Sequence, residues 1–356
     1  MNFKFSVKRL AILLILAVLL AALIFLTARP AATVKPGQPE AGVPRTTPTL
    51  SAGIGIKSDI LTFEGELMIV SSDRRQVILA SAAGNRQIQI SEDEASAPAL
   101  SHDGQKIAYI SPLGMLQVYD MATQQSSQVK DIVAGAASQM QWSADDQRLA
   151  YGCFFTTTHA EEVCIYDFAT DTNEVYTNTP ELMGVTSVVP YDGITLGGWS
   201  ADGKKMALLL TVDPTPGLEY KHYTLGSILI LDVETKEVKT VFAEEKGSEM
   251  VHVCCTVISP NGKTILFSAK TGDYNAIYRI NVDGSGLERI TPVSDHFDIV
   301  YPVWSPDGKA FAAYISQKDQ TELSGPAIFS LSGELLDRLD IPDANNVTYW
   351  INSAGQ

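Results

Sequence analysis

Residues 303–315, VWSPDGKAFAAYI, decide the fold of this chain of 356 residues. Versions of the same phrase begin at Ala99, Gln141, Gly198 and Val257. In each, an apolar approach leads into a Ser-x-Asp/Asn-Gly type turn and then into another apolar run. The Asx and Gly residues suit a tight turn that needs positive φ, and the flanks have strand composition. The serines of the five phrases lie 42, 57, 59 and 46 residues apart, at Ser101, Ser143, Ser200, Ser259 and Ser305.

A second phrase follows each first one. In the third copy it reads ILILDVETKEVKTVF from Ile228, and it predicts a strand, a polar turn and another strand. Each unit therefore has four predicted strands in roughly 40–60 residues, which is typical of the blade of a β-propeller.

Tryptophan gives an internal check on the repeat. Trp142, Trp199 and Trp304 occupy the same position, just before the repeat serine, and we expect them to pack between blades. Trp350 lies in a sixth copy of that innermost strand, which the chain end cuts off. Residues 65–91 supply three further strands. We therefore predict an all-β, six-bladed propeller whose last blade joins one C-terminal strand to three N-terminal strands, an arrangement that removes the exposed edges.

With these repeats, residues 60–356 resemble the TolB-like six-bladed propellers, which are related to the WD-repeat class. Residues 304–309, WSPDGK, are the cleanest match, whereas Asp145-Asp146 departs from the Asp-Gly pair. The resemblance implies a fold and, through TolB, partner binding. The distinct N-terminal domain of TolB has no counterpart here, and the repeat motif specifies fold better than function.

The N-terminal part of the chain predicts that the protein is located at a membrane. Residues 10–27, LAILLILAVLLAALIFLT, contain no charge or proline and are long enough for a helix to cross a bilayer. Residues 1–9 form a short basic segment that we expect in the cytoplasm. Residues 28–59, rich in Pro and Thr, predict a tether. We expect an uncleaved signal anchor at the cell membrane with residues 60–356 on the extracytoplasmic side; cleavage after residue 27 would make the protein secreted.

Charge restricts the class of partner. The formal charge is -15, and residues 1–50 hold six of the 26 basic residues but one of the 41 acidic residues. That leaves 20 basic and 40 acidic residues in the remainder, about -20. Such a body repels phosphate and is a poor candidate for binding nucleic acid. It favours a basic partner or a divalent cation.

The predicted connections differ between the two faces of the propeller. We label the four strands of a blade a to d from the axis outward. On one face the turns are short and repetitive, which indicates a structural role. On the other face, the loops that join strand b to strand c and strand d to strand a of the next blade are long and irregular, at 178–197, 212–226, 243–254 and 291–301. Long loops on a rigid scaffold commonly carry binding sites. The predicted binding face comprises His159, Tyr220, His222, Tyr223, His252, Asp295, His296 and Asp298.

No motif identifies a cofactor. His222, His252 and His296 come from adjacent blades and are weak candidates for metal ligands, but no zinc-type spacing supports them. A calcium site is conceivable in so acidic a chain, although no EF-hand string occurs. The chain also lacks a GxSxG elbow, a GxGxxG fingerprint and a Walker loop. We therefore predict no catalytic residue and no cofactor beyond a conceivable divalent cation.

Two pairs of cysteines have different expectations. Cys153 and Cys164 lie in neighbouring predicted strands, which could bring them opposite each other as a disulfide outside the cytosol; two reduced buried thiols are the alternative. Cys254 and Cys255 are adjacent, and the sequence leaves their oxidation state open.

The sequence therefore favours a membrane-tethered, extracytoplasmic propeller that binds a protein or peptide partner through its b–c and d–a loop face and the mouth of its central channel. The alternative is a propeller enzyme, a lyase or a glycan-processing hydrolase, with a metal or carboxylates at the channel mouth.

Overall fold

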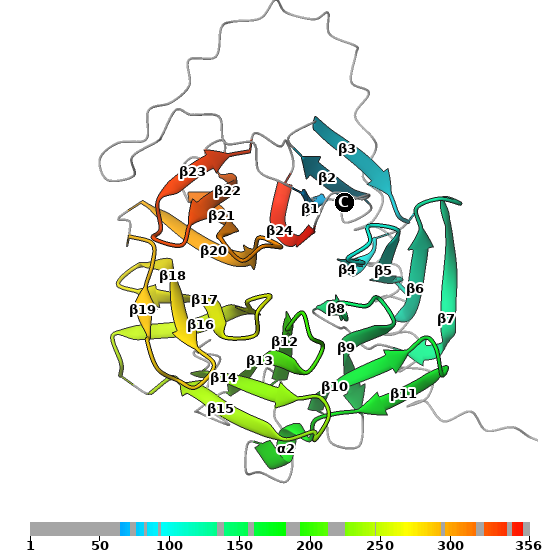
Figure 1. Cartoon of the computed structure of the whole chain (residues 1–356), viewed down its shortest axis with the longest axis horizontal. Helices are drawn as coiled ribbons and strands as arrows, with labels where there is room; N and C mark the ends of the chain where they lie inside the picture. The colour runs from blue at the N-terminus through cyan, green and yellow to red at the C-terminus, as the bar shows by residue number, and fades with distance from the viewer. Residues whose placement is uncertain are drawn as a thin grey trace, which may run out of the picture. The chain divides into compact units, whose positions relative to one another are not determined.

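Six antiparallel four-stranded sheets surround one axis in the part of the chain that the structure describes (Figure 1). Each sheet is one blade, and its first strand lies nearest the axis. From the axis outward, blade I contains β4 (Ser96–Leu100), β5 (Lys106–Ile110), β6 (Met115–Asp120) and β7 (Gln125–Val133). Blade II contains β8 (Met140–Trp142), β9 (Arg148–Phe155), β10 (Ala160–Asp167) and β11 (Thr172–Val175).

The remaining blades continue the same order. Blade III contains β12 (Gly193–Trp199), β13 (Lys205–Val212), β14 (Leu225–Asp232) and β15 (Val238–Ala243), and the short helix α2 (Thr179–Leu182) precedes it. Blade IV contains β16 (Met250–Ile258), β17 (Thr264–Thr271), β18 (Tyr274–Asn281) and β19 (Glu288–Arg289). Blade V contains β20 (Phe297–Trp304), β21 (Ala310–Gln317), β22 (Gly325–Ser330) and β23 (Leu335–Arg338).

Blade VI closes the ring as the sequence predicts. Its innermost strand is β24 (Ala344–Ile351), which pairs antiparallel with β1 (Glu66–Ser71), followed by β2 (Gln76–Ser81) and β3 (Gly84–Gln89). Gly65, at the start of this pairing, has a φ of 99°, and a Cβ there would lie 2.1 Å from the carbonyl oxygen of Ile351. Only glycine allows the two ends of the propeller to approach so closely.

The structure, a computed structural model, describes residues 65–71, 76–81, 84–91, 94–133, 139–155, 160–182, 193–212, 225–245, 247–292, 296–317, 324–339 and 344–351. They all belong to one unit, 51–356. The predicted cytoplasmic segment, membrane span and tether lie outside these residues. Among the described residues, no helix has the length and apolar character needed to cross a bilayer.

Burial on both faces of the inner strands explains why their sequences are continuously apolar. Ile265, Leu266 and Phe267 in β17 are all fully buried, because one face meets blade III and the other meets blade V. The hydrophobic clusters accordingly lie between blades rather than in one central core. One joins Ala207 and Leu209 of blade III to Ile265 and Phe267 of blade IV.

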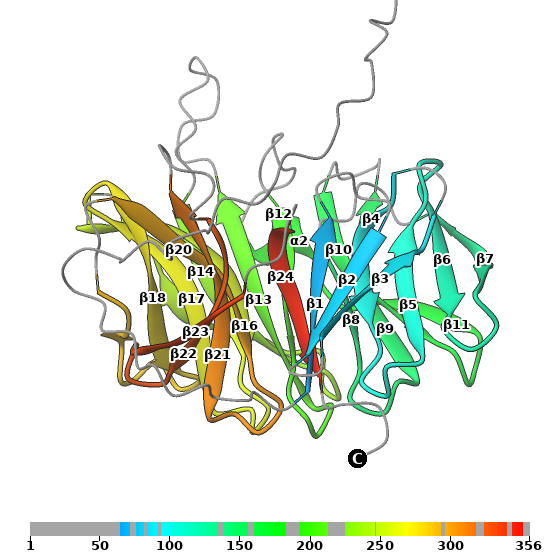
Figure 2. The same ribbon diagram turned by 90° about the horizontal axis from the view of Figure 1, so that it is seen from above.

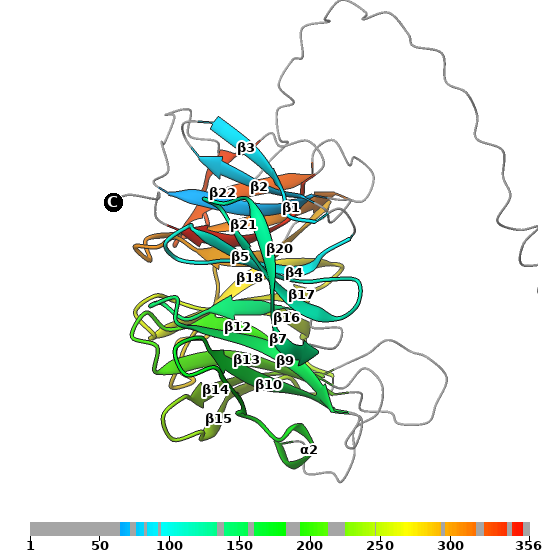
Figure 3. The same cartoon turned by 90° about the vertical axis from the view of Figure 1, so that its right-hand side faces the viewer.

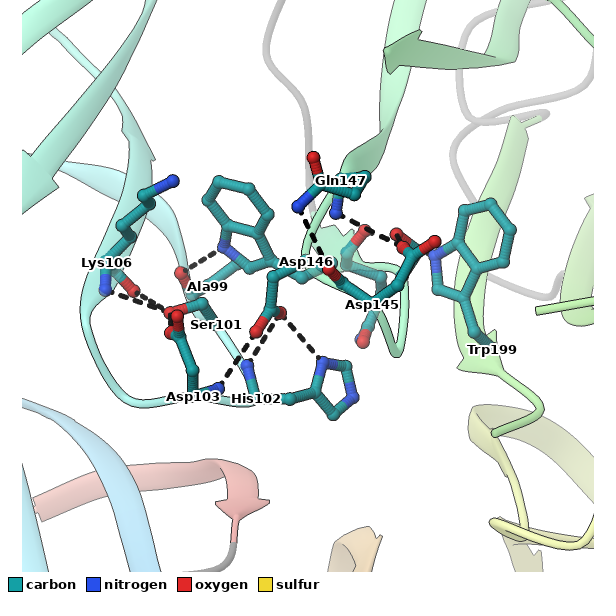
Figure 4. A network of polar contacts seen from close by, with 12 residues as sticks. Ala99, Ser101, His102, Asp103, Lys106, Asp145, Asp146, Gln147 and Trp199 are labelled. Carbon is teal, nitrogen blue, oxygen red and sulfur yellow. Dashed lines mark hydrogen bonds and ion pairs between the residues drawn. The ribbon is translucent and has the colours of Figure 1, made fainter. Parts of the chain in front are cut away.

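The Ser-x-Asp-Gly turns form one repeated hydrogen-bond pattern (Figure 4). In blade I, the Ser101 hydroxyl donates to Asp103 Oδ1 over 2.6 Å and accepts from the Lys106 amide over 2.9 Å, while Asp103 Oδ1 accepts from the Gln105 amide. The same bonds recur at Ser143, Ser200, Ser259 and Ser305. Figures 2 and 3, viewed edge-on, show the strands of each blade running between the same two faces.

Asp146 explains the departure of the second repeat from Asp-Gly. Its φ is 53°, in the left-handed region that Gly104 and Gly203 occupy in other copies. Its carboxylate accepts hydrogen bonds from the amides of His102 and Asp103 in blade I and lies 3.1 Å from His102 Nδ1 (Figure 4). Although burial raises the pKa of Asp146, these bonds outweigh burial and hold the pKa below its ordinary value. Asp146 thus joins two blades where glycine could not.

The turn aspartates predict a loss of stability in acid. The Ser305 hydroxyl, with Lys309, lowers the pKa of Asp307 from 3.8 to about 2, against a smaller opposing effect of burial. Because the folded pKa is lower, Asp307 stabilises the fold above about pH 4 and loses that contribution as the pH falls toward about 2. Asn261 holds the equivalent position in blade IV, where Ser259 donates to it. We expect Asp307→Asn to lower the melting temperature near neutral pH and to lower it by less near pH 2. An equal deficit at both pH values, measured by calorimetry, would contradict this assignment.

The repeat tryptophans pack between blades, as predicted. Trp142 Nε1 donates to the carbonyl of Ala99 over 3.0 Å, Trp199 to that of Gln141 and Trp304 to that of Val257, each over 3.2 Å. The acceptor always lies two residues before the repeat serine of the preceding blade. The repeat thus encodes the contact between blades as well as the turn within each blade.

Candidate binding pocket on the propeller axis

A pocket of about 760 Å³ lies on the axis, between the innermost strands of the six blades. All four tryptophans of the chain line it. The residue that follows the repeat serine also lines it in five blades, so that the pocket reaches the face that carries the short turns. These five residues are His102, Ala144, Ala201, Pro260 and Pro306.

The lining is uncharged. None of the described residues that line the pocket is Asp, Glu, Lys or Arg, although residues 51–356 carry about -20. The wall consists of aromatic, proline, small and aliphatic side chains, with polar groups such as Gln139, Gln141 and Tyr301. Such a surface can bury apolar side chains and orient a ligand through a few hydrogen bonds, and its volume is that of a typical ligand site.

Irregular backbone builds part of this wall. The innermost strands β4, β16 and β20 each have a register shift that contains one non-glycine residue with positive φ: Ala97 at 50°, Cys255 at 58° and Tyr301 at 56°. Each lies four residues before its repeat serine and lines the pocket. A left-handed non-glycine residue costs on the order of 1 kcal/mol or more, and such strain is often kept at binding sites. Tyr301 is 41% exposed, an unusual value for a large side chain on an inner strand.

Tyr349 also lines the pocket and links two blades that are not neighbours in the ring. Its hydroxyl donates to the carbonyl of Met140, so that β24 of blade VI contacts β8 of blade II. Burial raises the pKa of Tyr349 strongly, so the phenol stays neutral and remains a donor at physiological pH.

Of the predicted binding-face residues, the three that the structure describes, His252, His296 and Asp298, do not line this pocket. His159, Tyr220, His222, Tyr223 and Asp295 lie outside the described residues. His252 lies within β16 and Asp298 within β20, so both belong to inner strands rather than to the loops that the sequence suggested, and His296 is exposed just before β20.

The described members of that set have local partners instead. Asp298 Oδ1 accepts from the amide of Asn275 over 2.7 Å and from its side chain over 2.9 Å, which ties β20 to β18. The His252 amide donates to the buried Glu244 over 3.3 Å. Within the described ranges, no group of three His, Cys, Asp or Glu side chains is placed to hold a metal ion. The three-histidine site and the loop face remain predictions.

Cys153 and Cys164 are joined by a disulfide bond, with a Cα–Cα distance of 5.8 Å. They are diagonal neighbours rather than directly opposite, because Cys153 faces Glu162 and Cys164 faces Tyr151. The bond connects β9 to β10 and is buried among the side chains between blades I and II. Cys254 and Cys255 are both free and partly exposed.

Sequence reasoning missed the pocket-lining residues of the short-turn face. The available signal was the position of these residues relative to the repeat serine. The positions one residue after it and four residues before it line the pocket in several copies, although the residue types differ. Individually they are ordinary Ala, Pro, Gln or Tyr residues, and only their arrangement around one axis makes them a site.

No protein family and no curated protein matches the sequence. Solved structures do match the fold. TolB from Acinetobacter baumannii superposes with a TM-score of 0.60 at 17% identity, over 81% of this chain and 67% of that chain. A TolB candidate from Agrobacterium tumefaciens gives 0.54 at 18% identity, over 78% and 89%.

The fold is that of a TolB-like six-bladed β-propeller. An oligogalacturonate lyase solved in complex with manganese also matches, with a TM-score of 0.51 at 14% identity, over 78% of this chain and 73% of that one. At these identities the likeness establishes the fold alone, and the fold serves several activities.

Proposed function

We propose that this chain is a binding module whose axial pocket receives an uncharged, partly apolar peptide segment of a partner protein. The observation that carries the proposal is the composition of the lining: four tryptophans, prolines and small residues, with no charged side chain among those described. Aromatic walls bury apolar side chains, and polar side chains in the lining such as Gln139, Gln141 and Tyr301 can bind polar atoms of the peptide. The likeness to TolB supports partner binding only by analogy.

The partner's flanking residues are proposed to be basic. The pocket itself is neutral, but residues 51–356 carry about -20, so that charge outside the lining attracts a positively charged partner. This combination separates the two roles: apolar contacts in the pocket give affinity, and the acidic surface speeds association at low salt.

We also propose that residues 10–27 hold the propeller at the cell membrane, on the extracytoplasmic side. The disulfide between Cys153 and Cys164 supports an oxidising compartment. The hydrophobic run and the basic residues before it support the orientation. The proposed partner would then be a cell-envelope or secreted protein.

The alternative function is that of a propeller enzyme. The similarity in fold to a solved oligogalacturonate lyase favours testing it. It requires polar groups that converge on a substrate. The two functions separate in one assay, in which the protein is incubated with an acidic polysaccharide with and without manganese. Formation of unsaturated, cleaved sugars that depends on this chain would favour the enzyme over the binding module.

Blocking the pocket is the direct test of peptide binding. Ala201 is exposed, lies in the turn of blade III and lines the pocket. Peptides would be selected by display from a library of neutral cores with lysine flanks. Binding would be measured by the fluorescence anisotropy of a dye-labelled peptide, because both variants described below add a tryptophan to the protein. We expect Ala201→Trp to weaken binding by at least about tenfold, or ~1.4 kcal/mol, because the indole occupies the pocket mouth.

Ala169→Trp is the matched control. Ala169 is also an exposed alanine in a short turn, between β10 and β11, but it does not line the pocket. We expect this variant to bind as wild type does. Equal affinities for wild type, Ala201→Trp and Ala169→Trp would place the peptide elsewhere and refute the proposed pocket.

A further inference from the structure

Cys254 and Cys255 are adjacent free cysteines whose sulfur atoms lie 2.8 Å apart. A disulfide bond is about 2.04 Å long, so a movement of about 0.8 Å would bring the two sulfurs within bonding distance. The fold therefore holds the two sulfur atoms close to bonding distance.

The backbone at the pair is not held by a regular ladder. Cys254 pairs with Ser268, but the register of β16 against β17 shifts on both sides of it, between Val251 and Cys254 and again between Cys254 and Val257. Cys255 lies in the second shift and has a φ of 58°. An eight-membered ring between adjacent cysteines requires the intervening peptide unit to reorient, and a bulge allows this with less disruption than a paired strand.

The pair is accessible from the axis. Cys255 lines the 760 Å³ pocket, and both cysteines are partly exposed. Cys255 is therefore the member of the pair that a small molecule in the pocket meets first, whereas the disulfide between Cys153 and Cys164 is buried between blades.

The two thiols are electronically distinct. The S–H of Cys255 donates to the sulfur of Cys254, which lowers the pKa of Cys254 despite its burial. The same donation, with burial and the adjacent negative charge, raises the pKa of Cys255. The resting pair therefore carries its negative charge on Cys254, whereas only Cys255 lines the pocket, so that reaction at Cys255 requires the shared proton to pass to Cys254 first.

We propose that Cys254 and Cys255 form a thiol–disulfide exchange site, which reacts with small-molecule disulfides in the axial pocket and closes reversibly into a vicinal disulfide. This inference uses the pocket but does not depend on its peptide ligand. One proton of the pair is lost to solvent, and the shared proton passes to Cys254. The Cys255 thiolate attacks one sulfur of the small disulfide, the S–S bond breaks, and the first small thiolate leaves with the proton of Cys254.

The second step closes the ring. The Cys254 thiolate attacks the Cys255 sulfur of the mixed disulfide, and the second small thiolate leaves and takes a proton from solvent. The two cysteines are oxidised to one disulfide, and the small disulfide is reduced to two thiols, so that electrons and protons balance. Excess dithiol reverses the reaction.

The test uses the full chain and oxidised glutathione. After reaction, remaining thiols are trapped with N-ethylmaleimide and the protein is digested with trypsin. Residues 247–263, between Lys246 and Lys263, contain both cysteines and no other lysine or arginine before the last residue. In wild type we expect this peptide to be lighter by two hydrogens, with neither maleimide nor glutathione attached, and to regain two maleimides after prior treatment with dithiothreitol.

Single variants test the order of the steps. In Cys254→Ser we expect glutathione to remain on Cys255, at a level at least about tenfold above wild type, because no second thiol resolves the mixed disulfide. Cys255→Ser is expected to react at least about tenfold more slowly, because Cys254 does not line the pocket.

The wild-type digest decides the proposal even if a variant fails to fold. Two maleimides, or two glutathiones, on residues 247–263 would overturn it. Residues 149–204 contain Cys153 and Cys164 in the same digest and are expected to stay unlabelled. Label on both peptides would show that Cys153 and Cys164 also carried free thiols and that reactivity is not specific to the pair beside the pocket, which would also overturn the proposal.

Discussion

A chain that ends at residue 343, and so lacks β24, is expected not to fold cooperatively. β24 pairs along the whole of β1, where Leu67, Met68 and Ile69 are fully buried. Its removal turns a central strand into an edge and exposes the apolar side chains between blades V, VI and I. The lost free energy is expected to be comparable to the whole stability of a domain, about 5–15 kcal/mol. Urea denaturation followed by circular dichroism is expected to show no sigmoidal transition.

The contacts of β24 explain why the effect spreads beyond one blade. Trp350 packs against a hydrophobic cluster that includes Ala312 and Ile328 of blade V, and Tyr349 donates to the carbonyl of Met140 in blade II. Cutting the strand therefore loosens several interfaces at once. An unpaired β1 is also expected to promote aggregation, because it presents a row of unpaired amides and carbonyls.

A chain that ends at Ile351 is the control for this truncation. It loses residues 352–356 but retains β24, and it is expected to unfold as wild type does. A second control adds the peptide 344–356 to the shorter chain, where it is expected to restore the cooperative transition. Wild-type unfolding of the chain that ends at 343 would refute closure by the C-terminal strand.

The blade count could be predicted because the signal repeats. Ser101, Ser143, Ser200, Ser259 and Ser305 mark one turn each, and Trp350 marks the sixth innermost strand. Closure of the ring could also be predicted, because three predicted strands precede the first repeat and one predicted strand follows the last. These features recur along the chain, so the repeat can be recognised even where a single copy departs from the pattern.

The strand limits near the axis could not be predicted in the same way. Cys255 and Tyr301 adopt left-handed φ values that sequence rules assign to glycine, so β16 and β20 continue through bulges where a loop was expected. His252 and Asp298 consequently belong to inner strands. Tertiary packing on both faces of each blade stabilises these bulges, and it has no local sequence signature.

The sequence pointed to the channel mouth, but the residues that line the pocket were missed because they are far apart in the chain. His102, Ala201 and Pro306 are neighbours only after six blades have closed around the axis. The role of Asp146 could not be predicted for the same reason, because its carboxylate binds the main chain of His102 in another blade. The residues that make contacts between blades could be recognised only when, like tryptophan, they are conspicuous in composition.

Trp142→Ala is expected to destabilise the propeller by about 3–5 kcal/mol, the range for removing a buried aromatic side chain. Trp142 is 1% exposed, its ring centroid lies 5.2 Å from that of Phe168, and its Nε1 donates to Ala99. The substitution leaves a cavity between blades I and II and removes the hydrogen bond to the carbonyl of Ala99 on β4. Trp142→Phe retains an aromatic ring but loses the hydrogen bond, for which we expect a smaller loss of about 1–2 kcal/mol.

Leu113→Ala is the control for this series, because Leu113 is 85% exposed and its removal is expected to change stability by less than about 0.5 kcal/mol. The free energies would be measured by urea denaturation of the full chain. Trp142→Phe is expected to cost less than Trp142→Ala because it keeps most of the buried ring and loses the hydrogen bond and part of the volume. If Trp142→Ala cost no more than Leu113→Ala, the repeat tryptophan would not hold the blades together.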